Sequence, residues 1–292
     1  MESKLGTCRA HGRRARSILA RPARFSEAGP QGVFAMVRRS VPHPLRVVLS
    51  QVSQLAARLA AAALPNRCAL CGNLSHAVIC AACDAAYWNE ARLRCAVCAM
   101  PLGAGRPRSR GAHAYRCDAC RNAAPPFDAT LALADYRPPL DRLARDLKFH
   151  ARLALGTEFA ARLARLIDDT PGAGTIDVVA PVPLSRSRLV RRGYNQAWAI
   201  ARPLARRLGV RADAALLVRV ADTAPQSRLD RRARRDNVAT AFAVCGDVAG
   251  RHVALVDDVM TSGATLAASA HALKAAGAAR VTNLVALRTA RD

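Results

Sequence analysis

Eight cysteines in four C-x-x-C pairs are the residues with the clearest chemical potential in this chain. Each pair can present two thiolates to one metal ion, whereas the cysteines of a secreted disulfide framework are scattered along the sequence. The segments CALCGNL and CAVCAMPL, which begin at the first and third pairs, look like an internal repeat. The eight residues are Cys68, Cys71, Cys80, Cys83, Cys95, Cys98, Cys117 and Cys120.

These thiolates suffice for two zinc ions, each with four tetrahedral sulfur ligands and no open coordination position. We therefore expect two structural zinc ions that stabilise the fold directly. The gaps between successive pairs are 8, 11 and 18 residues long, which favours the first two pairs on one ion and the last two on the other. Interleaved pairing and an iron–sulfur cluster are the alternatives, because thiolate donors alone do not select the metal.

A second chemical signal is the run VALVDDVMTSGAT near the C-terminus. An apolar strand delivers Asp257 and Asp258 to its carboxyl edge, where open α/β sheets bind ligands. The following turn begins a helix, so its hydroxyls, its backbone N–H groups and the helix dipole can surround one phosphate. The carboxylates suit the hydroxyls of an adjoining sugar, with a divalent cation on a diphosphate. A plain capping turn is the alternative, but it does not need two adjacent carboxylates. The expected phosphate loop comprises Thr261, Ser262, Gly263, Ala264 and Thr265.

Two arginine-rich segments precede this run. In the first, PVPLSRSRLVRRGYNQ, Arg191 and Arg192 lie in a basic stretch between an expected strand and the next expected helix. A solvated basic turn is one interpretation of this stretch. The second segment extends over residues 226–237 and contains Arg235. Its other arginines are equally consistent with a surface that follows a polynucleotide backbone.

The elements that must position these residues follow an α/β pattern. From Phe127 onward, short β-rich runs alternate with helical stretches, which predicts a parallel sheet flanked by helices. The expected strands span residues 130–136, 176–182, 216–220, 241–244, 252–257 and 281–287, and the expected helices span 140–148, 153–167, 196–208 and 264–276.

The chain divides into four expected segments. Residues 1–40 lack periodicity and mix Arg, Gly, Pro and Ser, which predicts a disordered basic extension. Residues 41–65 predict an amphipathic helix rather than a transmembrane segment, because Gln51, Gln54 and Arg58 interrupt a barely sufficient apolar stretch. The cysteine module covers residues 66–125, and the α/β domain covers residues 126–292.

The charge of the chain is strongly positive, at +24, and only Lys4, Lys148 and Lys274 among its 45 basic residues are lysines. A hydrophobic content of 51% excludes a wholly disordered basic chain. Arginine suits phosphate, but composition does not choose among nucleic acid, anionic lipid and small phosphates. Metal-type cysteine pairs without a secretory signal predict a cytoplasmic protein.

The run VALVDDVMTSGAT resembles the signature of type I phosphoribosyltransferases, which bind 5-phosphoribosyl 1-diphosphate (PRPP) with Mg²⁺. The resemblance implies that Asp257 and Asp258 hold the ribose 2- and 3-hydroxyls and that residues 261–265 hold the 5-phosphate. The C-x-x-C array, with the segments APVPLSRSRLVRRGYNQAWAIA and TAPQSRLDRRARRDNVATAF, further resembles the ComF family of competence-associated proteins. This resemblance covers about residues 66 to 290, and it includes Lys148 and Arg235. It implies that Arg191 and Arg192 lie in a loop near the diphosphate, as candidates to neutralise a leaving pyrophosphate, and that Arg235 lies in a flexible loop that closes over the substrate.

The resemblance implies a double zinc-ribbon module before a phosphoribosyltransferase-like domain. We expect PRPP binding and single-stranded DNA binding in DNA uptake and natural transformation, with competence helicase or transport proteins as further partners. If the domain is an active enzyme, it displaces pyrophosphate from the anomeric carbon. The alternative is a metabolic phosphoribosyltransferase in nucleotide salvage, although the sequence specifies no acceptor.

Overall fold

A five-stranded parallel sheet forms the centre of the fold in the computed structural model, which describes residues 65–88, 93–102, 115–220 and 241–290. The strand order is β3-β9-β8-β4-β5, and each neighbouring pair is parallel. This arrangement confirms the predicted α/β class. The strands are β3 (Ala129–Asp135), β4 (Val178–Pro181), β5 (Arg211–Ala212), β8 (His252–Met260) and β9 (Arg280–Arg288).

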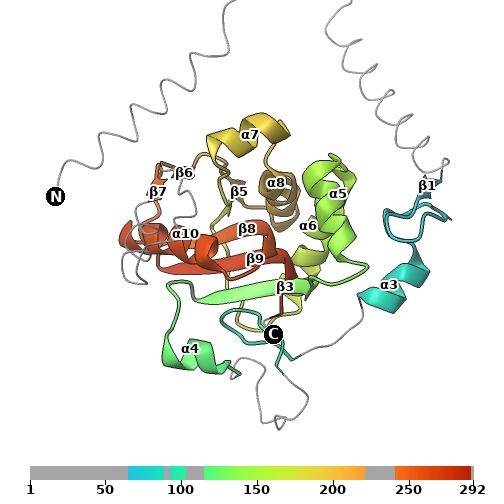
Figure 1. Cartoon of the computed structure of the whole chain (residues 1–292). Coiled ribbons are helices and arrows are strands. Elements are labelled where there is room, and N and C mark those ends of the chain that lie inside the picture. The colour runs from blue at the N-terminus through green and yellow to red at the C-terminus, as the bar shows by residue number, and fades with distance from the viewer. Residues whose placement is uncertain (1–64, 89–92, 103–114, 221–240, 291–292) are drawn as a thin grey trace, which may run out of the picture.

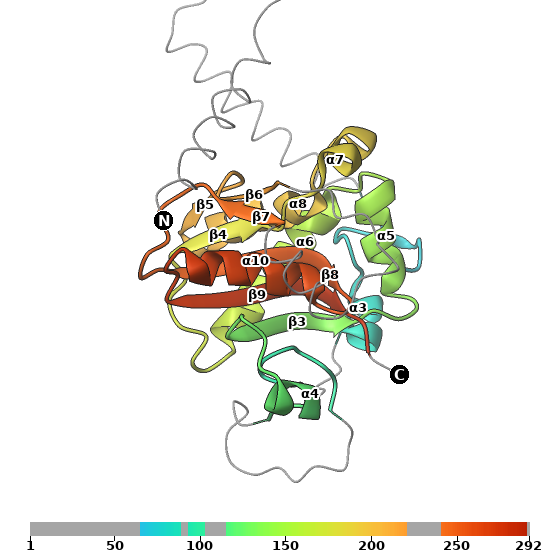
Figure 2. The same cartoon turned by 60° about the vertical axis from the view of Figure 1, so that its left-hand side comes forward.

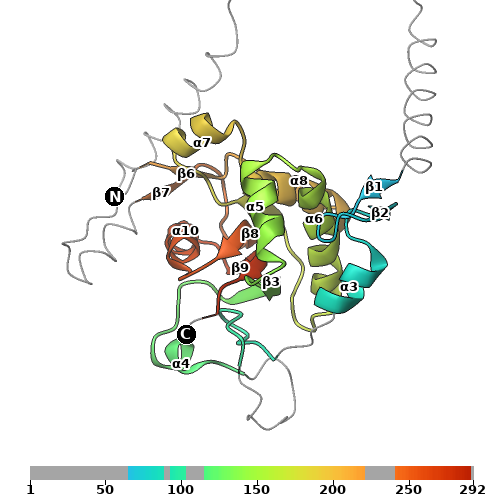
Figure 3. The ribbon, with the colours of Figure 1, turned by 45° about the vertical axis from the view of Figure 1, so that its right-hand side comes forward.

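Helices cover both faces of this sheet, as Figure 3 shows with the strands seen nearly end-on. The helix α10 (Ala264–Ala275) lies on one face, and α5 (Asp141–Phe149), α6 (Ala154–Asp168) and α8 (Gln196–Leu208) lie on the other. Because both faces are covered, β8 and β9 are buried almost throughout and read as apolar runs. The two layers form two separate hydrophobic cores.

A glycine allows the two longest helices to pack closely. A Cβ atom at Gly156 on α6 would lie 2.5 Å from the carbonyl oxygen of Ala199 on α8. Any larger residue at this position would push the helices apart, and α8 is the helix that carries Gln196 to the edge of the sheet.

Two expected strands do not join the parallel sheet, and this part of the prediction is wrong. The strands β6 (Leu217–Arg219) and β7 (Phe242–Val244) pair with each other in antiparallel fashion. Leu217 and Phe242 are buried in the core on the α10 face, so this two-stranded ribbon covers that layer instead of extending the sheet.

The first arginine segment is also different from the expected loop, because it forms the helix α7 (Arg186–Arg192). The side chain of Ser185 accepts a hydrogen bond from the N–H of Arg188 and begins the helix. Gly193, with φ of 79°, adopts the left-handed conformation that ends it.

Several expectations fall on parts of the chain that are not described. The expected extension over residues 1–40 and the expected helix over residues 41–65 lie outside the described residues, apart from Pro65. The second arginine segment, with Arg235, also lies outside them. Among the helices that the structure describes, none combines the length and apolarity needed to cross a bilayer.

Candidate metal centres and phosphate site

The structure brings the eight cysteines together in two groups of four. Within each group, the sulfur atoms all lie within 4.8 Å of one another. The grouping follows sequence order, as the spacing favoured, and not the interleaved alternative. The first cluster contains Cys68, Cys71, Cys80 and Cys83, and the second cluster contains Cys95, Cys98, Cys117 and Cys120.

The two clusters share one backbone design. In each, the N–H of the third cysteine donates to the sulfur of the first, at 3.3 Å for Cys80 to Cys68 and 3.3 Å for Cys117 to Cys95. The third cysteine also immediately precedes a short helix that carries the fourth. These helices are α3 (Ala81–Tyr87) and α4 (Asp118–Asn122).

In each cluster, the turn that follows the first cysteine has the same backbone conformation. The carbonyl of the first cysteine accepts a hydrogen bond from the residue four positions later, which is Gly72 in one cluster and Ala99 in the other. Both residues have positive φ, at 80° and 53°. The repeat seen in the sequence is therefore a structural repeat, with two copies of one ribbon.

The pKa values of these thiols indicate that a bound cation is needed to keep all four of a cluster deprotonated. A hydrogen bond from Cys98 lowers the pKa of Cys95 to about 4, while this bond and burial raise the pKa of Cys98. Likewise, burial and hydrogen bonds within the first cluster raise the pKa of Cys83 to about 12. One thiolate in a cluster opposes the ionisation of its neighbours, so a full set of four needs a bound cation. The donor set and its closed geometry fit a structural zinc site.

The first cluster lies beside α6, on the side of this helix away from the sheet. Figures 1 and 3 both show α3, which carries Cys83, in this position. The ring of Trp88 lies 6.2 Å from the ring of Phe159, and the guanidinium of Arg162 lies 4.6 Å from the Trp88 ring centre. Arg162 also forms an ion pair with Asp84 of α3. These contacts attach the first ribbon to the layer of α5, α6 and α8.

The second cluster lies at the carboxyl edge of the sheet. Arg94, just before Cys95, forms an ion pair of 2.7 Å with Asp135 at the end of β3. The carbonyl of Cys98 accepts a hydrogen bond of 3.0 Å from Arg288 at the end of β9. Cys95, Cys98 and Cys120 are part of the core on the α10 face, opposite the core that contains Cys68 and Cys83.

The two predicted carboxylates stand at the end of β8 in different surroundings. The side chain of Asp258 is only 2% exposed, and its Oδ1 accepts from Nε2 of Gln196 at 3.3 Å. Its Oδ2 lies 3.3 Å from Nζ of Lys148. Strand alternation places Asp257 on the opposite face, where it is partly buried. Burial and the neighbouring Asp258 carboxylate raise the pKa of Asp257 well above its ordinary value.

The predicted phosphate loop joins β8 to α10 and is open to solvent. Thr261, Ser262, Ala264 and Thr265 are exposed, and the N–H of Ala264, the first residue of α10, donates to Oγ of Ser262 at 3.3 Å. Gly263 has φ of 81°, and a Cβ atom there would lie 2.5 Å from Cε of Met260. An exposed helix N-terminus with hydroxyls and a close-approach glycine can bind an anion.

The predicted arginines have three different outcomes. Arg192 donates to Oε1 of Gln196, which in turn donates to Asp258, so this arginine is linked to the carboxylates. Arg191 is exposed on α7, without a direct contact to the carboxylates among the described residues. Arg235 lies outside the described residues.

Sequence reasoning missed the role of Gln196. The signal was present, because Gln196 begins a helix directly after the strand-end segment that carries the arginines. It also missed Arg288, an arginine at the end of the buried strand RVTNLVALR. Such a residue must find polar partners inside the protein, which is a sign of a structural or functional contact.

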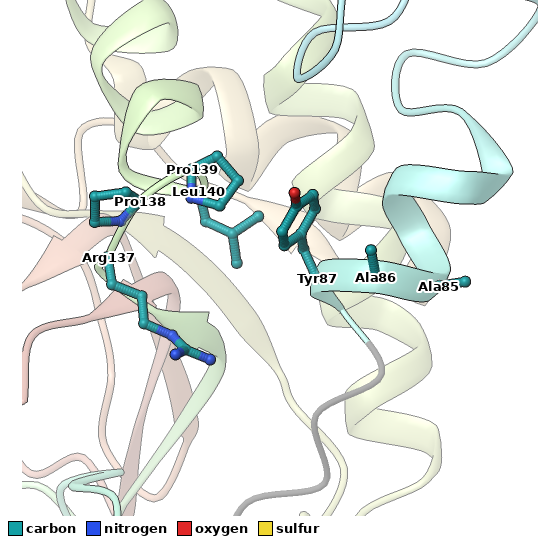
Figure 4. A pocket seen from close by; sticks show the side chains of 7 residues that line it. All are labelled: Ala85, Ala86, Tyr87, Arg137, Pro138, Pro139 and Leu140. Carbon is teal, nitrogen blue, oxygen red and sulfur yellow. The ribbon is translucent and has the colours of Figure 1, made fainter.

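A separate hollow lies between α3 and the turn from β3 to α5, shown in Figure 4. It has a volume of about 430 Å³, and Tyr87, Arg137 and Leu140 are among the residues that line it. None of the predicted site residues lines it, so the chemistry at the carboxyl edge of β8 does not use this hollow.

A parallel sheet whose central strand carries two adjacent carboxylates and leads through an exposed Thr/Ser/Gly turn into a helix is typical of a domain of the phosphoribosyltransferase type. In agreement, the family model described as "Phosphoribosyl transferase domain" matches residues 194–291. The chain is 37% identical over 228 residues to the DNA utilization protein YhgH of Salmonella typhi, covering 75% of this chain and 95% of that protein. With its two tetra-cysteine clusters ahead of this domain, the chain belongs to the ComF family of competence-associated proteins.

Two further relatives are similar over shorter stretches. Competence protein F of Haemophilus influenzae is 32% identical over 160 residues, which cover 53% of this chain and 70% of that protein. A ribose-phosphate pyrophosphokinase of a Marinomonas species is 37% identical over 106 residues, which cover 36% of this chain and 32% of that protein.

Proposed function

We propose that this protein binds PRPP with Mg²⁺ at the loop between β8 and α10. The observation that carries the proposal is the pair Asp257 and Asp258 near the carboxyl end of β8, separated by two residues from an exposed turn into α10. In this assignment, the 5-phosphate lies on residues 261–265, where backbone N–H groups and the helix dipole favour an anion. The carboxylates accept hydrogen bonds from the ribose hydroxyls. The match to the phosphoribosyltransferase family model supports the assignment.

The side chains around the carboxylates have distinct roles in this proposal. Gln196 and Lys148 hold Asp258 in place from α8 and α5. Arg192, which Gln196 contacts, adds positive charge on the side where the diphosphate leaves the ribose. Arg191 and Arg235 are further candidates for this charge. Bound Mg²⁺ neutralises part of the diphosphate charge. If transfer occurs, the bond from the anomeric carbon to pyrophosphate breaks as the bond to the acceptor forms.

The two cysteine clusters are proposed as two structural zinc sites. Each cluster has four closely spaced sulfur donors, and no further His, Asp or Glu among the described residues belongs to either group, which supports zinc in a closed tetrahedral site. Thiols that must remain reduced to bind metal fit the cytoplasm, which we propose as the location of the protein.

A surface beside the carboxylates suits single-stranded DNA. We define the α5–α7 surface as the exposed residues of α7 together with the end of α5, which lie side by side in Figure 2. Phe149 is 65% exposed and Val190 is 77% exposed, and the guanidinium of Arg192 lies 5.5 Å from the Phe149 ring centre. A flexible strand binds where basic side chains contact its phosphates and an aromatic ring stacks on its bases. The basic residues exposed on α7 are Arg186, Arg188 and Arg191.

These features support a role in DNA uptake, in which a phosphorylated sugar and a DNA strand meet the same edge of the protein. The names of the relatives refer to DNA utilization and to competence, and they motivate this part of the proposal.

Two titrations test the proposed function. Mg²⁺-PRPP should bind the wild-type protein in calorimetry and bind Asp257→Ala much more weakly, because the variant loses an acceptor for the ribose hydroxyls. A labelled oligothymidylate should bind with an affinity that falls steeply as salt rises. Failure of PRPP to bind the wild-type protein contradicts the site. Absence of DNA binding, with pyrophosphate release on adding a nucleobase or an amine, favours a salvage transferase instead.

A further inference from the structure

Arg288 connects the second cysteine cluster to the phosphate loop. It is the last residue of β9, and it is only 1% exposed although it carries a guanidinium. Its Nε donates to the carbonyl of Cys98 at 3.0 Å, and its Nη1 donates to the carbonyl of Met260 at 3.1 Å and to that of Thr261. One planar side chain therefore holds two segments that are far apart in the sequence.

The cost of burying this group implies that its contacts are well defined. A buried guanidinium is costly unless its N–H groups find acceptors, and charge-assisted hydrogen bonds are stronger than neutral ones. The acceptors here are backbone carbonyls, whose directions are set by the local chain path. A change in the turn at Cys98 would therefore alter the geometry at Met260 and Thr261, or would leave part of the guanidinium without acceptors.

Each end of this connection lies at a proposed ligand site. Cys98 is one of four candidate ligands of the second cluster, and the following residue, Ala99, holds the left-handed turn of that knuckle. Thr261 opens the loop that contacts the 5-phosphate in the proposed function. An ion at one end and a phosphate at the other each order the segment whose carbonyls Arg288 contacts.

The first cluster provides an internal comparison. It is attached to α6 through Trp88 and Arg162, in the core of the opposite layer. Within the described residues, no hydrogen bond or ion pair joins it to the loop between β8 and α10. The two clusters share one design, but in the part of the chain that the structure describes, only the second is in contact with the loop through a buried side chain.

We infer that metal binding by the second cluster and phosphate binding by the β8–α10 loop are thermodynamically coupled, with Arg288 as the positioning residue between them. The inference rests on the proposed function, because it takes the loop as the phosphate site. Coupling between two sites is reciprocal, so bound phosphate must retain the metal to the same degree that the metal favours the phosphate. The first cluster should not take part.

Equilibrium competition for zinc with a coloured chelator tests this coupling on the full zinc-loaded chain. With Mg²⁺-PRPP, and with ribose 5-phosphate as the simpler probe, one of the two zinc ions should be bound at least about fivefold more tightly, the lower end of typical coupling. The affinity for the other ion should be unchanged.

Two substitutions locate the effect. Arg288→Gln should abolish the ligand-dependent protection of the zinc ion. Arg288→Lys should reduce this protection, because lysine keeps the positive charge but lacks the planar set of N–H donors of a guanidinium. The matched control is Arg162→Gln, which removes the arginine that attaches the first cluster. It should weaken binding of the unprotected ion and leave the protection of the other ion unchanged.

The possible outcomes distinguish failure of the PRPP site from failure of the coupling. If calorimetry shows that PRPP does not bind the wild-type protein, the proposed function fails and the coupling fails with it. If PRPP binds but protects neither ion, or protects both equally, the coupling is wrong while the phosphate site stands. Protection that persists in folded Arg288→Gln, or that is undiminished in folded Arg288→Lys, contradicts the role of Arg288. The wild-type measurement decides for or against the coupling even if both Arg288 variants fail to fold.

Discussion

The Nζ atom of Lys148 lies 3.3 Å from Oδ2 of Asp258, and this pair joins the end of α5 to the end of β8. The carboxylate is almost fully buried, whereas the lysine is 30% exposed. The positive charge offsets the cost of keeping a carboxylate out of water, and Gln196 contributes a hydrogen bond to the other oxygen. One of the two site carboxylates is thus held in position by the fold itself.

This relationship predicts the effect of removing the lysine. Lys148→Met leaves the buried Asp258 carboxylate without its counter-ion, and it should lower the free energy of unfolding by about 1–3 kcal/mol. Urea denaturation measures this change. The matched control is Lys274→Met, because Lys274 is 29% exposed but its partner, Asp128, is 41% exposed. The control should cost only about 0–1 kcal/mol, and equal losses in the two variants would contradict the buried pair.

The raised pKa of Asp257 predicts a pH-dependent stability. Below the ordinary pKa of about 4, the carboxyl group is protonated in both the folded and the unfolded chain, so its ionisation does not change the free energy of unfolding. As the pH rises, the unfolded chain loses this proton first, so the group lowers the free energy of unfolding. Asp257→Asn should therefore stabilise the protein at pH 7, with a gain that disappears near pH 3.

Denaturation of the wild type and Asp257→Asn across this pH range measures the difference. Each kcal/mol gained should raise the melting temperature by about 2–4 °C. A stabilisation that is the same at pH 3 and pH 7 would show that the carboxylate charge is not its cause.

Gly263 should affect phosphate binding beyond its cost in stability. An alanine pays about 1–2 kcal/mol in the left-handed conformation, and its Cβ would also meet Met260 inside the loop. Gly263→Ala should weaken PRPP binding by about tenfold or more, equivalent to about 1.4 kcal/mol. Gly209→Ala is the control, because Gly209 has φ of 68° in open space at the end of α8. It should lose similar stability and bind PRPP normally, and a parallel loss of binding would contradict the loop as the site.

If the α5–α7 surface binds DNA, the loss of affinity should depend on where the removed arginines lie. Removing Arg188 and Arg191 together should weaken binding of oligothymidylate and reduce the slope of log affinity against log salt by about 1.4, for two lost contacts to a single strand. Arg206 and Arg207 provide a control of equal charge, since they lie in the last turn of α8, at the opposite edge of the sheet. Equal losses in the two double variants would indicate that binding depends on total charge alone.

The sequence pattern predicts the parts of the fold in which local chemistry decides the outcome. The apolar run at residues 252–257, the two carboxylates and the glycine after them specify a strand, an edge and a turn, and β8 and α10 follow closely. The cysteine spacing likewise favours the grouping that the structure adopts. The roles of individual site residues in PRPP binding stay predictions.

Long-range partners were not predictable in the same way. The arginines of α7 are expected in a loop because the family resemblance places them there, although Ser185 and Gly193 are ordinary signals for the ends of a helix. The antiparallel pairing of β6 with β7 depends on which layer buries Leu217 and Phe242. The contact of Arg288 with Cys98 depends on the placement of a whole ribbon against the sheet, which no local pattern encodes.

A crystal structure of the protein with Mg²⁺-PRPP tests the central claim most directly. The account predicts that the 5-phosphate lies within hydrogen-bond distance of the backbone N–H groups of residues 261–265 and that the ribose hydroxyls contact Asp257 and Asp258. Occupancy of the α5–α7 surface by PRPP, with the loop between β8 and α10 empty, would contradict it.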